Sequence, residues 1–158
     1  MDIKIRKATL KDLEEMQKLN LMLFEKEYNE YDKTLNKNWT FGKKGKNYFK
    51  ERILDSKNAF AMVSVVNKEV VGYLVGNVFS GENYRKQMKF AEGENMFVLS
   101  KFRGKGIGTQ LFEEFLRWCK QKGVDRVKLV ASSENKRAIK LYRNLGFRDY
   151  SLTFEKDI

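Results

Sequence analysis

The sequence contains no histidine, no proline and only one cysteine. The absence of histidine excludes Ser-His-Asp and Cys-His catalysis and most zinc sites, because all of these need an imidazole. Proton transfer must therefore use Glu, Asp, Tyr, Lys or water, and we predict no metal site. Cys119 has no partner for an internal disulfide. It falls on the apolar side of a predicted helix, where we expect a buried and inert thiol.

Long apolar runs are also missing. No stretch approaches the roughly 18 apolar residues of a membrane-spanning helix, and the first residues do not resemble a signal peptide. We therefore expect a cytoplasmic protein without a membrane partner. Its 158 residues, 42% of them hydrophobic, suit one domain over residues 1–158, and no repeat, low-complexity tract or Gly/Ser linker divides them.

Positive charge is concentrated in one part of the chain. The formal net charge is +11, and residues 101–148 hold 13 Lys or Arg against four acidic residues, so this segment carries most of the excess. Such an excess of positive charge suits binding of nucleic acid or of a polyanionic small molecule. Alternatively, it reflects only a lysine-rich surface that binds neither. Charge alone does not choose among these three interpretations.

Hydrophobic periodicity predicts a mixed α/β chain that begins with a strand and a helix. A helix capped by Thr9 follows the first strand, and a loop-rich, acidic and aromatic insert covers residues 25–45. Two strands and a tight turn at residues 65–70 form a hairpin, and a strand–helix–strand unit follows, which pairs its strands in parallel. The predicted strands are 2–7, 59–66, 70–79, 95–99, 127–131 and 150–154. The first predicted helix is capped by Thr9, and the other helices cover 46–54, 106–122 and 136–145.

Three alternating glycines lie between the strand at 95–99 and the helix at 106–122. Gly104, Gly106 and Gly108 permit positive φ angles and close approach to the backbone, so that successive N–H groups can surround an anion at the helix N-terminus. The spacing G-x-G-x-G fits neither a Walker loop nor a dinucleotide fingerprint. We therefore predict a phosphate-binding loop of another kind, with a ligand-free tight turn as the alternative.

This loop resembles the cofactor motif of the GNAT acetyltransferases, R/Q-x-x-G-x-G/A, through Arg103, Gly106 and Gly108. The resemblance extends on both sides. Residues 94–99 (ENMFVL) look like the splayed central strand of that family, and residues 135–147 look like its second cofactor element. The resemblance implies a central mixed, mostly antiparallel sheet flanked by helices, and an N-acetyltransferase that transfers the acetyl group of acetyl-CoA to a primary amine in a ternary complex.

The resemblance also implies site residues. The backbone of the splayed strand pairs with the pantetheine arm, the loop amides hold the pyrophosphate, and Asn135 contacts the arm, although Asn135 also suits a helix N-cap. Tyr142 occupies the position proposed to protonate the thiolate of coenzyme A, and packing on an apolar helix face is the alternative. The implied cofactor-binding residues are Met96, Phe97, Val98, Arg103, Gly104, Lys105, Gly106, Ile107, Gly108, Thr109, Asn135 and Tyr142.

For the base, the resemblance points to Glu94, which accepts the proton of the amine directly or through water. A strand-edge carboxylate is an equal alternative, because Glu92 lies two residues away on the same face. Some bacterial protein acetyltransferases of the family carry their base five residues before the asparagine. Here that position is Val130, which cannot accept a proton, so this chain is not expected to use the mechanism of those enzymes.

The acceptor is a small-molecule or peptide amine that the sequence does not identify. The insert supplies aromatic rings and the acids Glu25, Glu27, Glu30 and Asp32, and both kinds of group favour an ammonium ion. A solvated helix end is the alternative. The rival functions are a basic nucleic-acid-binding domain, which no recognised motif supports, and an acyl-CoA-binding regulator without turnover. Because members of this family often pair through their C-terminal strands, the resemblance also makes a homodimer an alternative to a monomer.

Overall fold

The computed structural model describes residues 2–158 and contains one sheet of five strands in the order β1-β2-β3-β4-β5. Neighbouring strands are antiparallel from β1 to β4, whereas β4 and β5 are parallel. The sheet is therefore mixed and mostly antiparallel, as predicted. The strands are β1 (Lys4–Lys7), β2 (Ala59–Val66), β3 (Glu69–Ser80), β4 (Lys89–Val98) and β5 (Arg126–Leu129).

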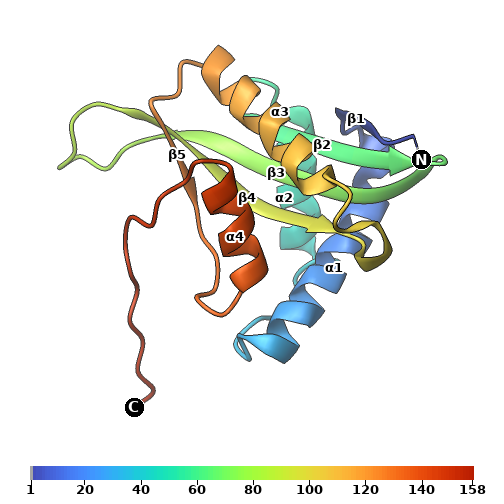
Figure 1. Cartoon of the computed structure of the whole chain (residues 1–158), viewed down its shortest axis with the longest axis horizontal. Coiled ribbons are helices and arrows are strands. Elements are labelled where there is room, and N and C mark those ends of the chain that lie inside the picture. Colours follow the sequence, from blue (N-terminus) through green and yellow to red (C-terminus); the bar gives the residue numbers. More distant parts are fainter. Residues whose placement is uncertain (1) are drawn as a thin grey trace.

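Helices cover both faces of the sheet. In Figure 1, α3 and α4 lie in front of the sheet, whereas α1 and α2 lie behind it. Each face has its own apolar core, centred on Phe112 and Phe115 for the front and on Met16 and Phe49 for the back. The helices are α1 (Leu13–Glu30), α2 (Lys43–Leu54), α3 (Ile107–Gln121) and α4 (Lys136–Asn144), and short 3₁₀ turns cover Leu10–Asp12 and Ser100–Phe102.

The hairpin between β2 and β3 is confirmed. Asn67 and Lys68 have φ angles of 49° and 67°, the left-handed conformation that a two-residue turn needs at both positions. Cys119 is buried, and burial raises the pKa of its thiol to about 12, so the expectation of an inert thiol is also confirmed.

The parallel pairing of β4 with β5 stops early. β4 pairs with β3 up to Val98, but it pairs with β5 only from Phe90 to Gly93. Among the described residues, the segment 94–98 therefore has a strand on one edge only. This is the splay expected from the sequence, although the strand begins at Lys89 and not at Asn95 as predicted.

A β-bulge at Glu94 interrupts β4 where the splay begins. β3 pairs with the residues on both sides of Glu94 but not with Glu94 itself. A bulge breaks the alternation of side chains, and here Glu94 and Asn95 both hydrogen-bond to Tyr48 of α2. Two consecutive residues of β4 thus face the helices on the back of the sheet.

The structure also corrects one predicted strand and three boundaries. The predicted strand at 150–154 is not formed: residues 148–158 have no helix or strand, and Leu152 and Phe154 are almost fully exposed. Figure 1 shows this segment leaving the body of the molecule. α1 continues to Glu30 into the region predicted as a loop, α2 begins at Lys43, and β5 ends two residues before the predicted Ala131.

Candidate functional site

The glycine loop leads from the end of β4 into α3. Gly104 and Gly106 have φ angles of 76° and 79°, which explains why glycine stands at both positions. Gly106 is the N-cap of α3, and the amide of Gln110 donates to its carbonyl at 3.0 Å. The amides of residues 107–109 precede this bond and have no acceptor within the helix. Together with the helix dipole, they form a site suited to an anion.

The loop, the splayed strand and α4 meet at Gly108. A Cβ atom at this position would lie 3.4 Å from Cδ2 of Leu141 on α4 and 3.5 Å from Cε of Met96 on β4. The free amides at the start of α3 are therefore adjacent to the open edge of β4. The three predicted elements, which are distant in sequence, meet at one place.

Arg103 holds the end of β4 in place. Its Nε donates to the carbonyl oxygen of Val98 at 2.7 Å, and its guanidinium lies 4.9 Å from the centre of the Phe97 ring. Burial and, secondly, the positive charge of Arg137 lower the pKa of Arg103. Two cations thus share the mouth of the splay, an arrangement that favours a polyanionic ligand. The Val98 carbonyl, which was expected to pair with the pantetheine arm, already accepts this hydrogen bond.

Asn135 is the N-cap of α4, because its Oδ1 accepts from the amide of Ala138 at 3.1 Å. Seven residues later, Tyr142 packs against Phe112 and Phe147 with ring centres 5.3 and 6.3 Å away. Its hydroxyl has no hydrogen-bond partner among residues 2–158. Burial, and then the negative charge of Glu27, raise the pKa of Tyr142 to about 12, so the hydroxyl is protonated at neutral pH.

Glu94 is held in an ion pair with Arg52 of α2. Arg52 Nε and Nη2 donate to its two carboxylate oxygens at 2.6 and 2.7 Å, and Tyr48 Oη donates to Oε2 at 2.8 Å. The side chains of Arg52 and Glu94 are only 15% and 20% exposed. Burial, reinforced by the charge of Glu94, raises the pKa of Tyr48 well above its usual value, so its hydroxyl remains a donor.

A chain of buried and partly buried hydrogen bonds extends from Glu94 across the back of the sheet. Each residue in the chain donates a hydrogen bond to the next one, and the last bond is donated to the carboxylate of Glu94. Such a network orders the polar groups of α1, α2 and the α1–α2 loop around the splay. From the far end of the chain toward Glu94, the bonds are Thr40 to Asn20 at 2.7 Å, Asn20 to Tyr73 at 3.0 Å, Tyr73 to Asn95 at 2.7 Å, Asn95 to Tyr48 at 2.9 Å, and Tyr48 to Glu94.

The acids of the insert have different surroundings. Glu30 pairs with Lys26, and Asp32 accepts hydrogen bonds from the amide and hydroxyl of Thr34 at 2.8 and 2.6 Å. Glu25 is exposed, in a shallow hollow between α1 and the α1–α2 loop. Glu27 is half-buried, and its carboxylate has no hydrogen-bond or ion-pair partner among the described residues.

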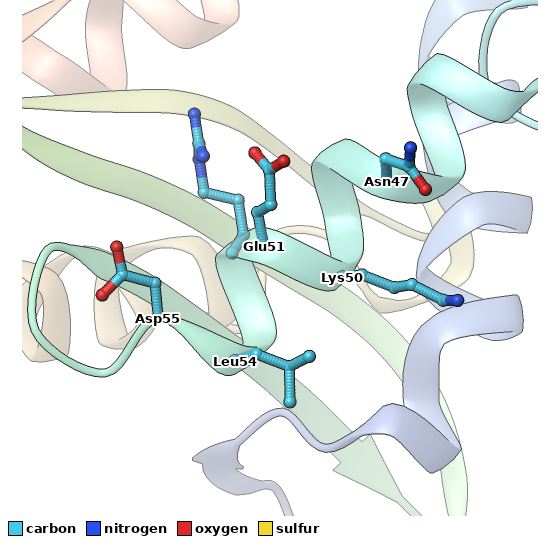
Figure 2. Close-up of a pocket in the computed structure, with 6 residues that line it drawn as sticks. Asn47, Lys50, Glu51, Leu54 and Asp55 are labelled. Carbon is cyan, nitrogen blue, oxygen red and sulfur yellow. The ribbon is translucent and has the colours of Figure 1, made fainter.

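A second shallow hollow lies along α2 (Figure 2). All its lining residues come from this helix and its C-cap, and the side chains of Lys50 and Glu51 point in different directions. Polar groups that diverge do not form a binding site for a small ligand. The candidate site is therefore the splay and not either hollow.

Sequence reasoning missed Tyr48 and Arg52, which lie four residues apart and so on one face of α2. Their spacing could have suggested a shared contact, but nothing in the sequence indicated that the contact is Glu94. Val130, at the position where some family members carry their base, is exposed and has no acid–base group. Lys105 lies 5.5 Å from the centre of the Phe102 ring, beside the loop.

The sequence profile of the acetyltransferase (GNAT) family matches residues 13–147, which include the splay, the loop and α4. The chain belongs to this family. It is 34% identical over 145 residues to an uncharacterized N-acetyltransferase of Methanocaldococcus jannaschii, a match that covers 92% of this chain but 60% of the relative.

Solved structures show the same fold. A mutant of the BH1408 protein from Bacillus halodurans superposes with a TM-score of 0.82 at 24% identity, covering 98% of this chain and 99% of the other. The PaiA N-acetyltransferase of Thermoplasma acidophilum, in complex with coenzyme A, superposes with a TM-score of 0.81 at 20% identity, covering 97% and 94%. Among residues 2–158, no helix has the length and apolar character needed to span a bilayer.

Proposed function

We propose that this protein is an acetyl-CoA-dependent N-acetyltransferase that acts on a primary amine. One observation carries the proposal: at Gly108, the free amides at the start of α3 lie against the open edge of β4 and against α4. An anion held by the amides leaves an attached arm free to extend along β4. The family and the fold agree with this arrangement.

The residues present fit acetyl-CoA, which supplies an acetyl group activated as a thioester when it is bound. The amides of residues 103–109 are suited to the pyrophosphate, and Arg103 and Arg137 add positive charge beside them. The open segment 94–98 of β4 offers backbone groups to an extended arm. A Cβ at Gly104 would meet nothing within 4 Å, so the loop is open to a ligand at that point.

Acetyl transfer needs a neutral amine and a proton for the departing thiolate. We assign the second task to Tyr142, whose protonated hydroxyl projects from α4 with no competing partner among the described residues. Two carboxylates are candidates for the first task, Glu94 and Glu27. Either acts from the back of the sheet.

The test is an acetylation assay with spermidine, L-lysine, kanamycin and a lysine-containing peptide. Release of the coenzyme A thiol, together with an acetylated amine detected by mass spectrometry, supports the proposal. Binding of acetyl-CoA without transfer to any amine would instead identify a non-catalytic acyl-CoA-binding protein. Binding of nucleic acid without binding of acetyl-CoA would reject both.

A further inference from the structure

We propose that Glu27 binds the acceptor as an ammonium ion and accepts its proton, and that Glu94 is a positioning residue. This inference rests on the proposed function and names the group that prepares the amine. It begins from the surroundings of the acids near the splay. Glu94 already accepts three hydrogen bonds from Arg52 and Tyr48, so an approaching ammonium ion would have to compete with a bidentate guanidinium.

Glu27 has the opposite surroundings. Its carboxylate is half-buried and unpartnered, whereas Glu30 and Asp32 are engaged by Lys26 and Thr34, and Glu25 is exposed. An unpaired carboxylate away from water is costly for the folded state unless a cation arrives. An ammonium ion is the ligand that this environment favours most.

The position of Glu27 on α1 directs it toward the splay. Asn20 lies seven residues earlier, on the same helical face, and hydrogen-bonds to Tyr73 of β3 at 3.0 Å. Two helical turns further along, Glu27 is close enough for its charge to raise the pKa of both Tyr73 and Tyr142.

The coupling between Glu27 and Tyr142 crosses the sheet. α1 lies behind the sheet and α4 in front of it (Figure 1), and a continuous sheet would separate them. The pairing of β4 with β5 ends at Gly93 and Leu129, so the two strands do not close the sheet beyond these residues, and the charge of Glu27 acts on Tyr142 from the other face. An amine beside Glu27 and a thioester sulfur beside Tyr142 would thus approach from opposite faces.

The environment of Glu27 also suits a base. Burial is the main cause that raises its pKa, Lys26 opposes the shift, and Asp32 adds to it. The other titratable groups that face it are Tyr73 and Tyr142, both protonated at neutral pH. A carboxylate with a raised pKa is better matched to proton transfer near neutrality than an ordinary one.

In the proposed reaction, two protons leave the amine nitrogen and one proton reaches the departing sulfur. The ammonium ion gives one proton to the Glu27 carboxylate, and the free lone pair forms the N–C bond with the thioester carbonyl while the C–S bond breaks. The electron pair leaves on sulfur, which takes the proton of Tyr142. The remaining surplus proton of the new amide nitrogen returns to Tyr142 through water, and Glu27 releases its own proton to solvent.

The experiment compares Glu27→Gln, Glu94→Gln and Glu14→Gln, using the fastest amine of the panel named above. Glu14 is the matched control, because it removes the same charge from an exposed position at the start of α1. We expect Glu27→Gln to lower kcat/KM for the amine by about 10²-fold or more and to remove the acidic limb of its pH profile. The KM for acetyl-CoA should stay within about twofold of the wild-type value, because ground-state cofactor contacts are intact.

A second readout does not depend on turnover. With coenzyme A present, calorimetry should show that Glu27→Gln binds the amine at least about tenfold more weakly, whereas Glu14→Gln binds it as the wild type does. If Glu27→Gln does not fold, Glu27→Asp provides the same test with the charge retained, and we expect it to keep the acidic limb at a lower rate. Wild-type kcat/KM in a Glu27 variant, with an acidic limb that only Glu94→Gln removes, would overturn the assignment. A wild-type protein that binds no acetyl-CoA would overturn the proposed function itself, and the assignment with it.

Discussion

Arg52 of α2 and Glu94 of β4 form a bidentate ion pair with N···O distances of 2.6 and 2.7 Å, and the pair joins α2 to the bulge in the splayed strand. The two residues are 42 positions apart in the sequence. The pair fixes the back of the site before any ligand binds.

Replacing Arg52 by Gln should destabilise the fold by about 1–3 kcal/mol, because a largely buried carboxylate loses its charged partner. The estimate is below that for a fully buried pair, since both side chains remain partly exposed. Urea unfolding measures the change. Lys44→Gln, which removes the same charge from an exposed position of α2, should cost less than about 0.5 kcal/mol. Equal losses in the two variants would show that the ion pair contributes nothing.

The ion pair of the buried Asp12 with the partly exposed Arg6 should make stability depend on acid pH. Arg6 donates to both oxygens of Asp12 at 2.7 and 2.8 Å, and these bonds are the main cause that lowers the pKa of Asp12. The folded pKa lies below the unfolded value of about 3.9, so the stabilisation is complete above that pH and is lost as pH falls through the folded pKa.

Asp12→Asn should therefore be less stable than the wild type at pH 7, by about 1–3 kcal/mol, and the difference should shrink toward pH 2. Thermal unfolding across this range measures it. A difference that stays constant from pH 7 to pH 2 would show that the ionised carboxylate of Asp12 is not its source.

Two glycine substitutions separate backbone strain from cofactor binding. Gly106 and Gly123 both have left-handed φ angles, of 79° and 66°, but only Gly106 lies in the loop. Alanine at either position should cost a similar free energy of about 1 kcal/mol, because the backbone strain is the same in kind. Only Gly106→Ala should weaken acetyl-CoA binding, since it alone changes the amides that face the pyrophosphate. Equal affinity in both variants would mean that the loop has been misassigned.

Tyr142→Phe tests the proton donor. Phenylalanine fits between Phe112 and Phe147, so the fold and cofactor affinity should change little. Turnover should fall by about 10²-fold, because the hydroxyl acts only when the thiolate departs. Steady-state kinetics with a measured acetyl-CoA affinity separates these effects. Full turnover with chemistry rate-limiting would make Tyr142 a packing residue and leave protonation to solvent.

The sequence sufficed to predict the order of the elements and the loop, because the signals there are local. The glycines at 104, 106 and 108, the apolar stripe of α3 and the turn at Asn67 are each read from neighbouring residues. The same reasoning predicted a strand at 150–154 from the alternation of apolar residues. That strand is absent because in the structure those residues meet no strand with which to pair, and dimerisation through it stays a prediction.

The surroundings of the site's carboxylates could not be predicted. For Glu94, a base and a strand-edge carboxylate are equal interpretations of the sequence, with Glu92 on the same face, but the bulge that turns Glu94 toward Arg52 is a property of the pairing with β3. The electrostatic coupling of Glu27 to Tyr142 likewise depends on where β4 and β5 separate. Local patterns point to candidate ligand-binding residues, whereas tertiary contacts decide what each one can do.

The central claim is that the loop at residues 103–109 and the splay of β4 bind acetyl-CoA. Isothermal titration calorimetry of the wild-type protein with acetyl-CoA tests it most directly. The account predicts binding of one molecule per chain with a Kd in the micromolar range, corresponding to about −8 kcal/mol, and a higher Tm in its presence. No heat of binding and no shift in Tm at about 1 mM acetyl-CoA, a concentration that would saturate a micromolar site, would contradict it.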